Sequence, residues 1–194
     1  MSCSARHGIH QEDQTFNKIG FSLFKSKFVS SSCPKRFGNE NSGTFFPTRG
    51  LESFDVSLFK EKNKNIKIYL SDPTGSALYN HIMNGELKAE GGSITEGIGS
   101  SRITKNFAEA KIDGAFSIND QESLPILYDL IQNEGLSLGT SCGVNIAGAI
   151  RLGKELGPGK TIVTILCDRS DKYNSKMFNK SFLKEKNLPI PSWL

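Results

Sequence analysis

Short apolar runs alternate with longer amphipathic segments from residue 66 onward. Residues 66–70 and 115–118 are such runs and predict strands, the first of them stopped by Ser71-Asp72-Pro73. Residues 161–167 are apolar at most positions, which predicts a strand buried on both faces. Residues 136–138 predict a further short strand. Because strands and helices alternate, the pattern predicts an α/β fold in which helices flank a parallel sheet.

The clearest helix signal follows the strand at residues 115–118. Asn119 can cap a helix, with Glu122 three residues on as the reciprocal partner of a capping box. Apolar residues then recur at helical spacing, and Gly135 supplies a left-handed stop. Pro125 lies inside this segment and predicts either a kink or a later start.

Other segments have helical or loop composition. Residues 56–63 suit the end of a helix, residues 76–84 a short helix closed by Gly85, and residues 143–156 a longer helix. Residues 91–99 hold too many glycines for a helix or a strand, so they are expected to form a loop.

The first part of the chain has a different composition. Residues 1–54 are rich in Ser, Asn, Gly and Lys with isolated Phe, and they show no sustained period. We therefore expect residues 1–54 to be an unrelated segment, disordered or wrongly joined, and residues 55–194 to be the folded domain. Residues 14–39 carry basic residues and no acidic ones, which leaves a mitochondrial transit peptide open beside a cytoplasmic location. Residues 1–54 contain no continuous apolar run of the length that a secretory signal needs, so a secretory signal is not expected.

Charge and hydropathy argue against two classes of partner. The net charge of +4 comes from scattered Lys and Arg without a basic stripe, so nucleic-acid binding is not expected. The longest apolar run, residues 161–167, is much shorter than the ~20 residues that a membrane span needs. The expected partners are small molecules or other protein chains.

The cysteines and histidines give no metal or disulfide pattern. Cys3, Cys33, Cys142 and Cys167 contain no C-x-x-C pair, which predicts reduced thiols in an intracellular compartment. Cys3 lies near two histidines, at positions 7 and 10, but a fourth ligand is lacking. No metal site is predicted.

Two glycine-rich loops are the candidate functional segments. Ligands of a parallel sheet bind beyond the carboxyl ends of its strands, where Thr140-Ser141-Cys142-Gly143 is expected as a strand-to-helix turn with outward N–H groups. In the other loop, Gly97 and Gly99 permit left-handed dihedrals and close approach of the backbone to a ligand. Taken singly, each loop is more often a packing turn, and Glu96 is more often a surface carboxylate.

Taken together and in this order, the two loops and the segments around them resemble the second half of cysteine synthase. This is a family of pyridoxal-phosphate enzymes of fold type II, with a tryptophan-synthase-β-like architecture. The matching stretches are residues 56–59, 71–79, 85–90, 93–99, 148–153, 157–168, 173–178 and 188–194. The resemblance therefore covers most of residues 55–194 and implies pyridoxal phosphate as the cofactor.

The resemblance assigns residues on the cofactor side of such a site. Ser141 matches the serine that hydrogen-bonds the pyridine nitrogen of the cofactor. A hydroxyl is too weak an acid to protonate that nitrogen, which suits β-elimination and β-replacement. Gly97 and Gly99 match backbone that lines the face of the cofactor beside the substrate. The residues implied at the rim of the substrate pocket are Ile98, Asp168 and Tyr173.

The chain also departs from the family pattern. Ser170 stands where a glycine is common, and Lys172 where an arginine is common. No lysine lies in the family's Asn-Pro-x-Gly-Ser-x-Lys context, so no catalytic residue is assigned and the Schiff-base lysine is taken as absent. The phosphate-binding Gly-Thr-Gly-Gly-Thr loop is expected just before Val56, where residues 45–55 do not contain it.

The family activity is β-replacement on an activated serine, in which sulfide or another thiol displaces the β-substituent and cysteine is formed. Without the lysine and the phosphate loop, we expect the chain to be a truncated member that is inactive alone and exposes apolar surface. The open alternative is a non-catalytic remnant that forms a dimer with a full-length homologue, or regulates one. A second copy of this chain is another expected partner.

Overall fold

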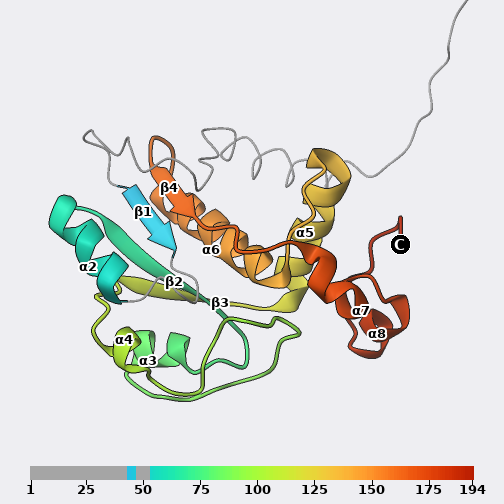
Figure 1. The fold of residues 1–194 in the computed structure, drawn as a ribbon, viewed down its shortest axis with the longest axis horizontal. Helices are drawn as coiled ribbons and strands as arrows, with labels where there is room; N and C mark the ends of the chain where they lie inside the picture. The colour runs from blue at the N-terminus through green and yellow to red at the C-terminus, as the bar shows by residue number, and fades with distance from the viewer. Residues whose placement is uncertain (1–42, 47–52) are drawn as a thin grey trace, which may run out of the picture. The chain divides into compact units, whose positions relative to one another are not determined.

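A four-stranded parallel sheet with strand order β3-β2-β1-β4 lies at the centre of the fold (Figure 1). In this computed structural model, β1 lies between β2 and β4, and Thr44 is paired with both Lys67 and Ile162. The strands are β1 Gly43–Phe46, β2 Lys67–Pro73, β3 Gly114–Ile118 and β4 Thr161–Thr164. The prediction of a parallel α/β sheet is therefore confirmed.

The structure describes residues 43–46 and 53–194, with side chains from Val56 onward. The basic segment at residues 14–39 lies outside the described residues, as do Cys3, Cys33 and the two histidines at positions 7 and 10. The expected boundary at residue 55 stays a prediction. Strand β1 and the first residues of α2 precede that position and are nevertheless part of the same unit, Asn41–Leu194.

Helices lie on both sides of the sheet. In Figure 1, α5 and α6 lie above β2 and β3, and α3 and α4 lie below these two strands. The helices are α2 Ser53–Lys62, α3 Leu78–Asn84, α4 Lys105–Ala108, α5 Asp120–Glu134, α6 Thr140–Leu156, the 3₁₀ turn η1 Ser170–Tyr173, α7 Asn174–Met177 and α8 Lys180–Glu185. Gly85 and Gly135 end α3 and α5 with φ of 75° and 67°, as their left-handed stops predict. Among the described helices, none is long and apolar enough to cross a membrane.

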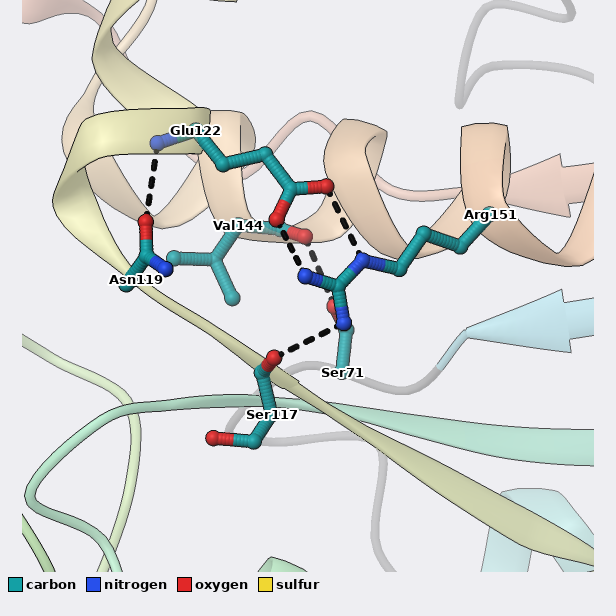
Figure 2. Close-up of polar contacts among 6 residues, drawn as sticks. All are labelled: Ser71, Ser117, Asn119, Glu122, Val144 and Arg151. Atoms are coloured by element: carbon teal, nitrogen blue, oxygen red, sulfur yellow. Dashed lines mark hydrogen bonds and ion pairs between the residues drawn. The ribbon is translucent and has the colours of Figure 1, made fainter.

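The polar residues at the end of β2 do not stop the strand, contrary to the prediction. Ser71 and Asp72 are buried, and the pairing with β3 continues to Pro73, opposite Ile118. The hydroxyl of Ser71 donates to the carbonyl of Val144 in α6 at 2.7 Å (Figure 2). Because the helix satisfies this hydroxyl, a polar residue is tolerated inside the layer.

Two other strand predictions were wrong in extent. Strand β4 ends at Thr164 and is only half-buried, because it lies at the edge of the sheet with β1 as its neighbour. Cys167, expected at the end of this strand, lies beyond it and is exposed. Residues 136–138 form no strand, since only Leu138 bridges to Arg169.

The first turn of α5 is capped as predicted, but the predicted capping box is only half formed. The side chain of Asn119 accepts a hydrogen bond from the backbone N–H of Glu122 at 3.0 Å. The Glu122 carboxylate does not return to Asn119. It pairs instead with Arg151 of α6, whose Nε donates to it at 3.0 Å and whose Nη1 donates to the Ser117 carbonyl at 3.0 Å (Figure 2). One guanidinium thus ties α6 to both α5 and the end of β3.

Helix α5 also begins earlier than a proline at position 125 suggested. It runs from Asp120 to Glu134 with Pro125 inside it. Leu124, Leu127 and Tyr128 of this helix are buried in the core cluster that also contains Cys142. Burial of this apolar face against α6 outweighs the backbone hydrogen bond that the proline cannot make.

Helix α6 approaches α5 closely because residue 143 has no side chain. A Cβ at Gly143 would lie 2.9 Å from both Leu127 Cδ1 and the Ser123 carbonyl oxygen. A residue with a side chain at position 143 would push the two helices apart.

We predict that Arg151→Lys lowers the free energy of unfolding by about 1–2 kcal/mol, because an ammonium cannot bind both oxygens of Glu122 and the Ser117 carbonyl together. Urea unfolding measures the change. The matched control is Arg169→Lys, since Arg169 and its partner Asp171 are both exposed and such pairs contribute at most ~1 kcal/mol. Equal losses in the two variants would contradict the assignment.

Candidate functional site

The first turn of α6 contains Ser141 and begins earlier than expected. Gly139 is the N-cap, so Thr140, Ser141 and Cys142 are helical and do not form a turn before a helix at residue 143. Thr140 and Ser141 are 1% and 3% exposed. The N–H groups of a helix's first turn have no partner within the helix, so this end is suited to an acceptor.

The start of α6 is held against the segment that follows β4. The backbone N–H of Gly139 donates to the carbonyl of Asp168 at 3.0 Å. A Cβ on Gly139 would lie 2.1 Å from Asp168 Oδ1 and 2.7 Å from the Tyr173 ring, so only glycine fits. Two predicted rim residues therefore lie directly beside the turn that carries Ser141.

Asp168 and Tyr173 interact with each other at this contact. The Tyr173 hydroxyl donates to Asp168 Oδ2 at 2.7 Å. Burial, followed by the hydrogen bond and charge of Asp168, raises the pKa of Tyr173 to about 12, so it stays a protonated donor at neutral pH. Asp168 Oδ1 is buried and has no hydrogen-bond partner among the described residues. Thr140 Oγ1 is also buried and has no hydrogen-bond partner among the described residues.

The loop at residues 91–99 is anchored by a residue that sequence reasoning missed. Asp120, the first residue of α5, is 6% exposed and accepts from the Ser93 hydroxyl at 2.6 Å and from the Ile94 N–H at 2.8 Å. An acidic residue after an N-cap is normally explained by the helix dipole. Nothing in the local sequence signals that this carboxylate also binds a loop 26 residues earlier.

Gly97 and Gly99 both have left-handed backbone, with φ of 82° and 81°. Their surroundings differ. A Cβ at Gly99 would meet Pro73 Cγ and Ser76 Cβ at 3.0 Å, whereas a Cβ at Gly97 would meet nothing within 4 Å. Gly99 is therefore required by packing as well as by its dihedral, and the space beside Gly97 is open.

The same loop reaches α6 and α7 through its side chains. Ile98 packs against the cluster that contains Val144, one turn along α6 from Ser141. Glu96 forms an ion pair with Lys176 of α7. The structure thus brings the Ser141 turn into contact with Asp168 and Tyr173, and it joins the loop at residues 91–99 to α6 and α7.

Asp72 is a second buried carboxylate that the sequence did not single out. It is 1% exposed at the end of β2 and accepts from the Tyr79 N–H at 2.8 Å, so it caps α3 from outside that helix. Burial raises the pKa of Asp72 to about 6, although hydrogen bonds from Ser76, Tyr79 and Leu78 oppose the shift.

Within the described part of the chain, no three His, Cys, Asp or Glu side chains are grouped so that they could hold a metal ion. The polar groups that the structure places at the site are hydroxyls, backbone N–H groups and the Asp168–Tyr173 pair.

Comparison with known proteins gives the class of this domain. Residues 56–168 match the family of pyridoxal-phosphate dependent enzymes, and the chain belongs to this family. Within it, the chain is 37% identical to cysteine synthase from Dictyostelium discoideum over 74% of its own length and 40% of that relative. It is 40% identical to cysteine synthase 1 from Emericella nidulans over 71% of its length and 38% of that relative. The chain thus spans about two fifths of the curated relatives it matches.

A solved structure agrees with the fold. The crystal structure of O-acetylserine dependent cystathionine beta-synthase from Helicobacter pylori matches with a TM-score of 0.61 and 29% identity, over 70% of this chain and 43% of that one. The resemblance to cysteine synthases and the fold class expected from it are confirmed.

We predict that Gly99→Ala lowers the free energy of unfolding by about 2–4 kcal/mol, because it adds close contacts with Pro73 and Ser76 to the cost of a left-handed alanine. The matched variant Gly97→Ala has the same dihedral in open space and should cost about 1–2 kcal/mol. Urea unfolding of both variants makes the comparison. A loss in Gly97→Ala as large as in Gly99→Ala would show that packing is not the difference.

The raised pKa of Asp72 predicts that the free energy of unfolding depends on pH. Its native pKa, about 6, lies above the ordinary value of 3.8, so the native state binds more protons than the unfolded state between these values. The resulting stabilisation is present below pH ~4 and is lost as the pH rises through about 6, by on the order of 3 kcal/mol. Asp72→Asn should abolish this fall in unfolding experiments from pH 4 to 7. The exposed Asp171→Asn serves as control, and an unchanged slope in Asp72→Asn would refute the assignment.

Proposed function

We propose that residues 56–194 form the ring-binding and substrate-facing side of a pyridoxal-phosphate site that carries out β-replacement on an activated serine. The observation that carries this proposal is the burial of Ser141 in the first turn of α6, next to Asp168 and Tyr173. The Ser141 side chain is a hydroxyl, which can both donate and accept a hydrogen bond with a ligand at this end of α6.

The residues present fit the ring end of the cofactor. Ser141 offers a neutral hydroxyl to the pyridine nitrogen, and the open space beside Gly97 leaves backbone bare for a flat ring. When bound, pyridoxal phosphate supplies the electron sink that makes the α-proton of an amino acid acidic. A hydroxyl partner keeps that sink weak, which favours loss of the β-substituent.

The chain's own residues also shape the substrate side. Tyr173 holds the Asp168 carboxylate in place as a protonated donor across the neutral pH range. The ion pair between Glu96 and Lys176 joins the loop at residues 91–99 to α7. We propose that these two contacts fix the rim of a pocket for a small amino-acid substrate, with Ile98 at its edge.

The phosphate end and the Schiff-base lysine are not accounted for by residues 53–194. The phosphate loop of the family would fall just before Val56, where residues 47–52 lie outside the described part of the chain. The sequence has no lysine in the family's motif. We therefore propose that the chain does not turn over substrate by itself and that the lysine is contributed by other sequence.

A second candidate function is binding to a full-length homologue without chemistry. It is favoured by Met83 and Leu87, which are 52% and 49% exposed at the end of α3 and just beyond it. The two residues are four positions apart in the chain, and exposed apolar side chains that form a patch are typical of contact surfaces. A cytoplasmic or mitochondrial location remains a prediction from residues 1–54 under either function.

The test is addition of pyridoxal phosphate to the purified chain, followed by borohydride reduction and peptide mass analysis. The chain alone should give no adduct on a single lysine. Co-expression with the lysine-bearing amino-terminal part of Dictyostelium discoideum cysteine synthase should give an adduct on that part and sulfide-dependent formation of cysteine. A specific adduct on the chain alone would overturn the proposed inactivity, and a complex without an adduct would favour the binding function.

In the reconstituted complex, Ser141→Ala should lower turnover about tenfold or more, because one positioned hydrogen bond to the ring is lost. The control is Ser117→Ala, since the contact of Ser117 in Figure 2 is made by its backbone carbonyl. Equal turnover in the two variants would contradict the role of Ser141.

A further inference from the structure

The two cysteines in the described residues lie against each other. Cys142, in the first turn of α6, is fully buried, and Cys167, three residues beyond the end of β4, is exposed. The backbone N–H of Cys167 donates to the sulfur of Cys142 at 3.2 Å. The Cys142 thiol in turn donates to the Asp168 carbonyl at 3.5 Å.

These distances bring the two residues within reach of a covalent bond. An N–Cα bond measures about 1.46 Å, so the Cα of Cys167 lies no more than ~4.7 Å from the sulfur of Cys142. In a disulfide, three covalent bonds would join this sulfur to the Cα of Cys167, and a separation of this size is short enough for them to span.

The environments of the two sulfurs give them different roles. The hydrogen bond to the Cys167 thiol, together with burial, raises the pKa of Cys142 and keeps its thiol protonated. Cys167 is the sulfur that an oxidant in solution can reach. The sulfur of Cys167 accepts from the side-chain amide of Asn145 at 3.7 Å and donates to the carbonyl of Ile165 at 3.8 Å.

We propose that Cys142 and Cys167 are a redox-active dithiol that a peroxide closes to a disulfide. The Cys167 thiolate attacks one oxygen of the peroxide, so the O–O bond breaks, Cys167 becomes a sulfenic acid, and hydroxide leaves. The Cys142 sulfur then attacks the sulfenic sulfur, the S–O bond breaks, and the thiol proton leaves with the hydroxide as water. Two thiols are oxidised by two electrons, and one hydrogen peroxide is reduced to two waters.

Closure acts on the same turn that carries Ser141. The new bond removes the thiol donor of Cys142 from the Asp168 carbonyl and ties the first turn of α6 to the segment after β4. Cys142 is the next residue after Ser141, so in the oxidised chain the residue beside Ser141 is covalently bonded to Cys167. Any effect on cofactor binding rests on the proposed function, whereas the thiol chemistry does not.

The experiment treats the full chain with excess hydrogen peroxide and no pyridoxal phosphate, then maps it with trypsin under non-reducing conditions. Trypsin places Cys142 in the peptide of residues 112–151 and Cys167 in that of residues 161–169, away from Cys3 and Cys33. The expected product is these two peptides joined with the loss of two hydrogen atoms, and dithiothreitol should reverse it.

Two variants complete the test. Cys167→Ser should abolish the linked peptides, and because Cys167 is exposed this variant is expected to fold. Cys142→Ser should leave a sulfenic acid on Cys167 that a dimedone probe traps, whereas the wild-type chain loses that signal as the disulfide closes. Over-oxidation of Cys167 in the wild-type chain, with Cys142 still a thiol, would overturn the proposal, as would linkage of either residue to Cys3 or Cys33 alone. Because no cofactor is present, these outcomes are independent of the proposed function.

Discussion

The contact between Gly139 and Asp168 organises everything that surrounds the candidate site. The carboxylate lies so close to the Gly139 backbone that a Cβ would overlap it, and the Gly139 N–H donates to the Asp168 carbonyl. This contact sets where α6 begins and therefore where Ser141 lies. It also sets Tyr173, because the tyrosine hydroxyl binds the same carboxylate.

The packing of α5 against α6 fixes the position of α6 and so supports that contact. The two helices lie close together at Gly143, and Arg151, about two turns further along α6, joins them through Glu122. Because Asp120 in the first turn of α5 binds the loop at residues 91–99, any movement of α5 also moves that loop. The loop and the Ser141 turn are thus positioned by the same helix pair, although they are far apart in sequence.

Carboxylates hold several segments of the fold in place. Buried Asp72 and Asp120 accept from the N–H groups of Tyr79 and Ile94, and half-buried Asp168 accepts from the Tyr173 hydroxyl. Groups of this kind stabilise one arrangement strongly and leave unpaired atoms when the arrangement changes. The unpartnered oxygens on Thr140 and Asp168 mark where the described residues alone leave such groups unsatisfied.

Local sequence was sufficient for the elements whose signals are short in range. Asn119 capped α5, Gly85 and Gly135 ended their helices, and the alternation of strands and helices predicted the parallel sheet. These features depend on backbone dihedrals and on hydrogen bonds between residues a few positions apart. The residue types at those positions are therefore enough to predict them.

Tertiary structure decided the rest. Glu122 bonds to Arg151 and not to its own helix cap, and Ser71 continues a strand because Val144 accepts its hydroxyl hydrogen. Asp120 anchors a loop that precedes it, and Cys142 meets Cys167 from 25 residues away. In each case the partner is distant in sequence, so the choice depends on which segments the packed sheet and helices bring together.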